Sequence, residues 1–74
     1  MSRLPRITGS AMIAALERAA FRTIRARGSH RFLSHEDGRN TVVPEHAHET
    51  IGPGLLHKIL RDCRITVEDP RKWL

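Results

Sequence analysis

The dipeptide Asp37-Gly38, near the middle of the chain, constrains the fold more than any other feature. Glycine readily takes the positive φ that a tight hairpin needs, so the flanking segments are expected to pair antiparallel. Residues 30–35 before it and the β-branched run 40–43 after it predict two strands. Pro44 ends the second of these strands, because proline has no N–H to give to a ladder.

A second break, Gly28-Ser29, precedes the first of these strands. The segment before it, residues 21–26, alternates apolar and polar side chains, which is typical of a half-buried strand. The sequence therefore predicts three consecutive antiparallel strands.

A helix is predicted on either side of the strands. Residues 11–20 have apolar side chains at helical spacing, and Thr8 or Ser10 could cap their N-terminus. Pro53 suits the first turn of a second helix that continues over residues 54–63. Its expected apolar face consists of Leu55, Leu56, Ile59 and Leu60.

The resulting order is α-β-β-β-α, an α+β fold. The economical packing is a three-stranded antiparallel sheet with both main helices on one face and the other face open to solvent or ligand. This is the layout of double-stranded RNA-binding domains, an analogy of fold alone. A short helix over residues 67–74 is also possible, since Thr66 and Asp69 resemble a capping box. With 74 residues, we expect one domain, residues 1–74, whose active site is shallow.

The charge of the chain is strongly basic. Thirteen Lys and Arg, eleven of them Arg, oppose eight Asp and Glu, which gives a net charge of +5. This composition suggests a polyanionic partner, although a solvated basic surface would look the same. Cys63 is the only cysteine, so no internal disulfide is possible. No apolar stretch is long enough for a membrane span, and we expect a cytoplasmic protein.

Five landmarks in order along the chain resemble the HicA family of toxin ribonucleases. They are residues 16–21, Gly28-Ser29-His30, the hairpin at residues 35–38, Val42-Val43-Pro44-Glu45-His46, and Pro53-Gly54-Leu55-Leu56 with Ile59-Leu60. The chain departs from the family pattern at three positions. Ala20 and His48 replace glycines, and Gly52 stands where lysine is more usual.

The resemblance implies a function. It implies the toxin of a type II toxin–antitoxin system, a metal-independent endoribonuclease that cleaves mRNA and is inhibited by a HicB-type antitoxin. It also implies that His30 is the catalytic residue. Imidazole suits the required proton transfers, because its ordinary pKa lies near neutral pH.

Five neighbours of His30 are candidates for RNA binding. Gly28 would form the turn and allow close approach of the backbone, and Ser29 would donate to phosphate or only satisfy the turn. The arginines could hold phosphates or be solvated; they are Arg25, Arg27 and Arg31. Strand alternation places Arg25 and Arg27 on one side of the sheet, and it turns Arg31 away from His30.

Other residues are weaker candidates. His35 and His46 could supply a second proton-transfer group, or they could be ordinary strand-end and loop histidines. His57 is expected on a helix surface, and Phe32 could stack on a base or belong to the core. The segment Glu45-His46-Ala47-His48-Glu49 resembles a zinc-binding run, but no cysteine pair or His-x-x-x-His helix accompanies it. We therefore expect neither a metal nor a cofactor.

Two rival functions remain open. The first is a non-catalytic RNA-binding module of the same topology, which would usually carry a lysine-rich start to its last helix. Here no lysine precedes Lys58 in that helix, which favours the enzyme. The second is an interaction protein whose basic face meets an acidic protein, and this is compatible with an antitoxin partner.

Overall fold

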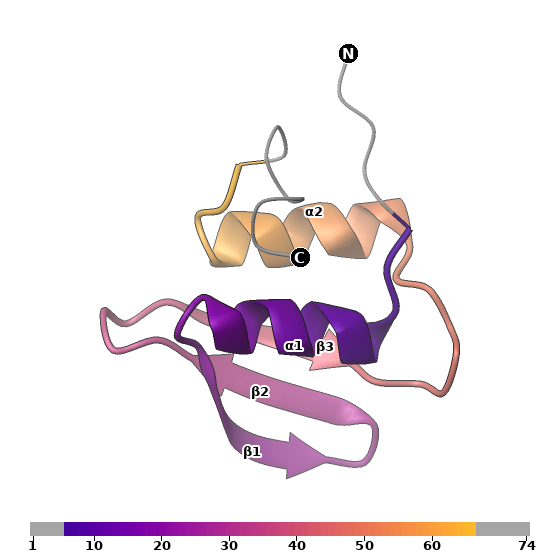
Figure 1. Ribbon diagram of the computed structural model, residues 1–74, viewed down its shortest axis with the longest axis horizontal. Helices are drawn as coiled ribbons and strands as arrows, with labels where there is room; N and C mark the ends of the chain where they lie inside the picture. Colours follow the sequence, from indigo (N-terminus) through magenta and orange to yellow (C-terminus); the bar gives the residue numbers. More distant parts are fainter. Residues whose placement is uncertain (1–5, 67–74) are drawn as a thin grey trace.

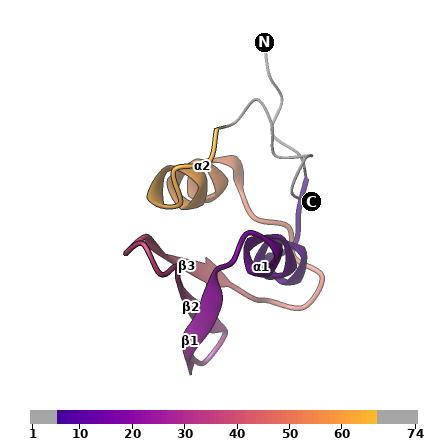
Figure 2. The same cartoon turned by 60° about the vertical axis from the view of Figure 1, so that its left-hand side comes forward.

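The computed structural model describes residues 6–66 and confirms the predicted α-β-β-β-α order. The elements are α1 (Gly9–Arg18), β1 (Arg22–Arg27), β2 (His30–Ser34), β3 (Asn40–Pro44) and α2 (Pro53–Asp62). The strands form one antiparallel sheet in the order β1-β2-β3. Both helices lie on the same side of this sheet, with α1 across the strands and α2 beyond β3 (Figures 1 and 2). The helix predicted for residues 67–74 lies outside the described residues.

The core lies between the helices and one face of the sheet. Thr8 caps α1, since its side-chain oxygen accepts a hydrogen bond from the Ala11 amide at 3.2 Å. The helix then turns its apolar side chains onto the sheet, as the spacing predicts. The largest fully buried side chains are Met12, Leu16, Phe21, Leu33, Val43, Ile59, Leu60 and Cys63.

Two apolar residues are more exposed than the sequence pattern predicts. Leu55 in α2 is 37% exposed, because only Leu56, Ile59 and Leu60 face the core. Ile24 in β1 is 65% exposed. The pairing of β1 with β2 shifts between Thr23 and Arg25, so Ile24 sits at a bulge on an edge strand. The prediction of a half-buried first strand is therefore wrong for most of β1.

Glycine makes both predicted turns possible. Gly28 has φ +58°, and Arg27 pairs with His30 across it, so the loop consists of Gly28 and Ser29 alone. A glycine with positive φ at the first position is the pattern of a type II′ turn. Gly38 has φ +97° and closes the second hairpin by donating its amide to the His35 carbonyl at 2.9 Å.

Both helices end in a Schellman motif without glycine. At the end of α1, Phe21 donates to the Leu16 carbonyl at 2.9 Å and Ala20 donates to the Glu17 carbonyl at 3.0 Å. Ala20 occupies the left-handed position with φ +72°. Arg64 does the same after α2, with φ +55°. A side chain in this conformation costs about 1–2 kcal/mol relative to the right-handed region.

We therefore expect Ala20→Gly to stabilise the protein. The relief of the left-handed strain exceeds the extra entropy that glycine gives the unfolded chain, which leaves about 0.5–1 kcal/mol. A thermal melt should show a rise of several degrees, at about 4–8 °C per kcal/mol for a domain of this size. Ala19→Gly is the control. Ala19 has φ −90° and gains no relief, so this variant should melt lower than the wild type.

Gly9 lets α1 rest directly on the end of β3. A Cβ at this position would overlap the backbone carbonyl oxygen of Pro44 and would lie 3.0 Å from the Cα of Glu45. Backbone atoms cannot swing aside as a flexible side chain can. The helix must therefore move if Gly9 carries any side chain.

We expect Gly9→Ala to destabilise the fold by about 2–3 kcal/mol, the usual cost of overpacking. Gly54→Ala is the matched control, because a Cβ at this helical glycine meets nothing within 4 Å. This variant should hold or raise the stability, since alanine favours helix. Urea unfolding curves of the two variants compare them directly, and equal midpoints would contradict the close contact.

Candidate active site

The register of the sheet brings most of the predicted site residues onto its open face. Residues directly opposite each other in an antiparallel pair point to the same face. His30 lies opposite Arg27 on β1 and Pro44 on β3, and Phe32 lies opposite Arg25 and Val42. The next residue on β2, Leu33, is buried on the helix side, so His30 and Phe32 face away from the helices. The predicted placement of Arg25 and Arg27 on one side is confirmed.

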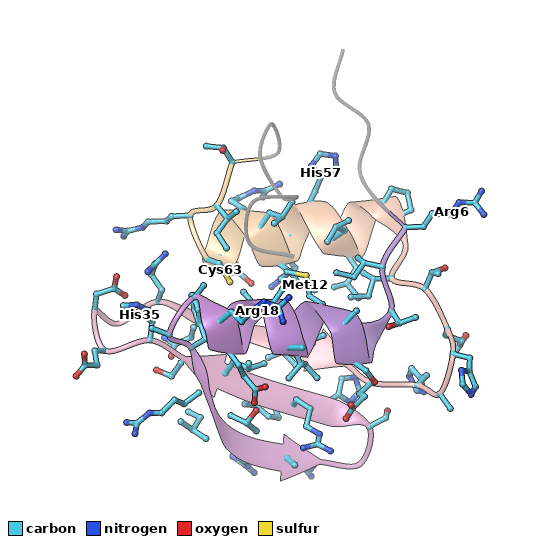
Figure 3. All side chains as sticks on the ribbon, in the orientation of Figure 1. Arg6, Met12, Arg18, His35, His57 and Cys63 are labelled. Atoms are coloured by element: carbon cyan, nitrogen blue, oxygen red, sulfur yellow. The ribbon has the colours of Figure 1, made fainter. Side chains whose placement is uncertain are left out.

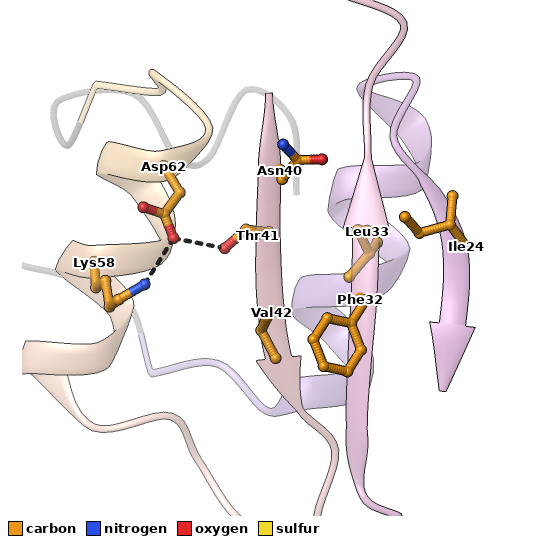
Figure 4. A pocket seen from close by; sticks show the side chains of 8 residues that line it. All are labelled: Ile24, Phe32, Leu33, Asn40, Thr41, Val42, Lys58 and Asp62. Carbon is orange, nitrogen blue, oxygen red and sulfur yellow. Dashed lines mark hydrogen bonds and ion pairs between the residues drawn. The ribbon is translucent and has the colours of Figure 1, made fainter. Parts of the chain in front are cut away.

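Arginine and apolar groups lie together on this open face. The Arg25 guanidinium stands 5.6 Å from the centre of the Phe32 ring. A hollow of about 350 Å³ extends from Phe32 and Val42 on this face past β3 to Lys58 and Asp62 of α2 (Figure 4). Its lining residues are Ile24, Phe32, Leu33, Asn40, Thr41, Val42, Lys58 and Asp62. Phe32 is half-buried here and does not belong to the main core, which leaves its predicted base-stacking role open.

The Arg31 side chain lies on the helix side of the sheet, whereas His30 faces the open side. Its Nε lies 2.9 Å from Oε1 of Glu45, and the other carboxylate oxygen of Glu45 accepts a hydrogen bond from the Ser10 hydroxyl at 3.0 Å. Arg31 therefore ties β2 to the segment after β3. Its proposed contact with RNA stays a prediction.

Ser29 connects the turn before His30 to the loop after β3. Its carbonyl accepts a hydrogen bond from the Glu45 amide at 2.6 Å. Its hydroxyl lies 3.4 Å from Nε2 of His46, and the other ring nitrogen of His46 lies 3.9 Å from a carboxylate oxygen of Glu49. One of the two weaker histidine candidates thus lies against the predicted site.

The other weak candidate, His35, lies at the opposite end of β2, beside the second hairpin (Figure 3). Its ring packs edge-on against Phe21 with centroids 5.2 Å apart, and its Nδ1 lies 3.0 Å from Asp37. A hydrogen bond from Arg39 holds the pKa of the Asp37 carboxyl below its usual range. His35 is thus part of a hairpin cluster. His57 is exposed on α2, as predicted.

The metal-ligating residue types at Cys63 and at residues 45–49 are not gathered into one cluster in the described part of the chain. Over residues 6–66, no three His, Cys, Asp or Glu side chains come together as metal ligands. Cys63 is fully buried, and this burial raises the pKa of its thiol to about 11. A buried thiol with a raised pKa is a weak nucleophile at neutral pH, so Cys63 belongs to the core and not to a reactive site.

No sequence pattern predicts the role of two residues that position the site. Gly9 interrupts no obvious pattern, and its importance follows only from the nearby backbone of β3. In the sequence, Glu45 belongs to the landmark at residues 42–46 and to a possible metal-binding run, and neither indicates that it contacts α1, β2 and the first hairpin turn. Its place directly after the strand-ending Pro44 is the one signal that could have indicated this role.

Fold and site together define the class of protein. This is a small α+β domain with the layout of double-stranded RNA-binding domains, and its open sheet face carries arginines around an exposed histidine. The chain belongs to the HicA toxin family, because the family model described as HicA toxin of bacterial toxin-antitoxin matches residues 9–65, more than half of its length. The family comprises toxins of bacterial toxin–antitoxin systems, so the chain is the toxin side of a toxin–antitoxin pair.

Two further observations complete the comparison. No curated protein matches the chain in sequence. Within residues 6–66, neither helix has the length and apolar character that crossing a membrane requires.

Proposed function

We propose that the chain is the toxin of a type II toxin–antitoxin system and a metal-independent endoribonuclease that cleaves mRNA with His30 as its catalytic residue. The observation that carries this proposal is the position of His30. It is exposed at the first residue of β2, directly opposite Arg27 across the two-residue turn Gly28-Ser29. A proton-transfer group and a phosphate-binding group thus lie side by side on an accessible surface.

RNA needs little else for cleavage. Its own 2′-hydroxyl attacks the adjacent phosphate when a base removes the proton and a cation stabilises the charge on the phosphate. On the open face, Arg27 lies opposite His30 and Arg25 lies two residues away on the same strand, and within residues 6–66 neither has a carboxylate partner. The turn at Gly28 and Ser29 lets the RNA backbone come close. No step requires a metal or a cofactor.

The antitoxin is proposed to be a HicB-type protein that covers the open face. A face that carries His30 and two arginines fits an acidic partner, whose charge would also speed the encounter. An interface of standard size takes about 800 Å² from each partner, and the chain exposes 5206 Å² in all. A partner with an interface of this size on the open face would therefore cover the site and block access of the RNA.

His30→Ala should lower RNA cleavage by about 10²–10⁴-fold, the usual contribution of a positioned acid or base, without changing the melting temperature. Cleavage by the wild type should survive EDTA and leave a 2′,3′-cyclic or 3′-phosphate. His57→Ala, which alters an exposed histidine on α2, is the control and should cleave normally. A folded His30→Ala protein with native activity would reject His30. A folded wild type that binds RNA and never cleaves it would favour the RNA-binding module.

The salt dependence of RNA affinity should show which of Arg25, Arg27 and Arg31 contact phosphate. For single-stranded RNA, log K falls with log salt by about 0.7 per phosphate contacted. Replacing Arg25 and Arg27 by alanine should reduce this slope by about 1 or more. Arg31→Ala should change it less, because Glu45 already pairs with this side chain. A 2′-O-methyl oligonucleotide, which cannot be cleaved, serves as the ligand. An Arg31 effect as large as that of the pair would place Arg31 at the RNA.

A further inference from the structure

We propose that His46 is a second catalytic residue, the acid that protonates the leaving 5′ oxygen of the RNA. This inference rests on the proposed function, since it assigns a role within that reaction. His46 lies on the loop after β3, two residues beyond the end of that strand.

Two backbone contacts hold together the segments that carry His30 and His46. The Glu45 amide donates to the Ser29 carbonyl at 2.6 Å, so the loop after β3 is bonded to the turn before β2. His30 itself pairs with Pro44, two residues before His46. The segments that carry the two imidazoles therefore meet at one end of the sheet, and they meet through backbone rather than through flexible side chains.

The ring of His46 points toward this turn. Its Nε2 lies 3.4 Å from the hydroxyl of Ser29, the residue that precedes His30 in the sequence. Its Nδ1 lies on the side of the Glu49 carboxylate, 3.9 Å away, so Nε2 is the ring nitrogen on the side of the turn and of His30. The side chain is 53% exposed, so an RNA strand on the surface can reach it.

The other described histidines lack this arrangement. His35 is engaged with Phe21 and Asp37 at the far end of β2. His57 lies on α2, on the helix side of the sheet. His48 is exposed two residues beyond His46, and no contact ties it to the turn at Ser29.

The two histidines complete a balanced reaction. His30 accepts the proton of the 2′-hydroxyl while the 2′ oxygen forms a bond to phosphorus. The bond from phosphorus to the 5′ oxygen breaks, and its electron pair takes the proton from Nε2 of His46. The products are a 2′,3′-cyclic phosphate and a 5′-hydroxyl. Exchange with water returns a proton to His46 and removes one from His30.

An RNA with sulfur in place of the leaving 5′ oxygen tests this role. A thiolate leaves without being protonated, so the substitution removes the need for the acid alone. His46→Ala should cleave ordinary RNA about 10²–10⁴-fold more slowly than the wild type, and it should cleave the sulfur-containing RNA at nearly the wild-type rate. His30→Ala should be impaired on both RNAs, because the 2′-hydroxyl still has to lose its proton.

The outcomes separate this inference from the proposed function. If the wild type cleaves both RNAs and His46→Ala matches it on ordinary RNA, or is equally slow on both, His46 is not the acid. Rescue of His30→Ala rather than His46→Ala would reverse the two roles and overturn the assignment. A wild type that cleaves neither RNA would reject the proposed function itself. His48→Asn, in the same loop, is the matched control and should cleave both RNAs normally.

Discussion

The direct contact between the first turn of α1 and the end of β3 is the constraint on which the site depends. Gly9 has no room for a side chain against the Pro44 carbonyl, so helix and strand meet backbone to backbone. Glu45, the first residue after β3, contacts three segments at once. Its amide bonds to the turn at Ser29, and its carboxylate bonds to Ser10 and Arg31. In a domain too small for a large core, such polar ties at a fixed corner decide how rigidly a surface site is held.

Ion pairs with carboxylates separate the arginines that stabilise the fold from those on the open face. Glu45 takes up Arg31 on the helix side of the sheet, and at the opposite end Asp37 pairs with Arg39, which also donates to the Cys63 carbonyl at 2.6 Å. Both arginines hold the fold together. Arg25 and Arg27 remain on the open face, where a phosphate would not have to displace a carboxylate. The number of arginines therefore overstates the basic charge that is available for ligand binding, because Arg31 and Arg39 pair with carboxylates of the protein itself.

The local signals in the sequence were sufficient for the elements and for one face of the site. Gly28 and Gly38 mark turns because both need positive φ, and strand alternation correctly grouped Arg25 with Arg27. Such local signals do not predict contacts between segments that are distant in the sequence. The bulge at Ile24 depends on how β1 pairs with β2, and the role of Gly9 depends on the backbone of β3. The approach of His46 to Ser29 spans 17 residues and follows from the path of a loop, which no periodicity encodes.

That loop has its own backbone cost. The Glu49 amide donates to the His46 carbonyl at 3.2 Å, which closes a four-residue turn, and His48 at its third position has φ +60°. Turns of this kind favour glycine there, so a histidine costs about 1–2 kcal/mol of strain. The same turn is what brings the Glu49 carboxylate back toward the His46 ring. The left-handed backbone at Ala20 ends a helix, whereas the same conformation at residue 48 closes the loop that carries His46 and Glu49. A shallow site has no deep walls to orient its groups, and a closed turn is one of the few means by which so small a domain can hold an exposed imidazole in a fixed direction.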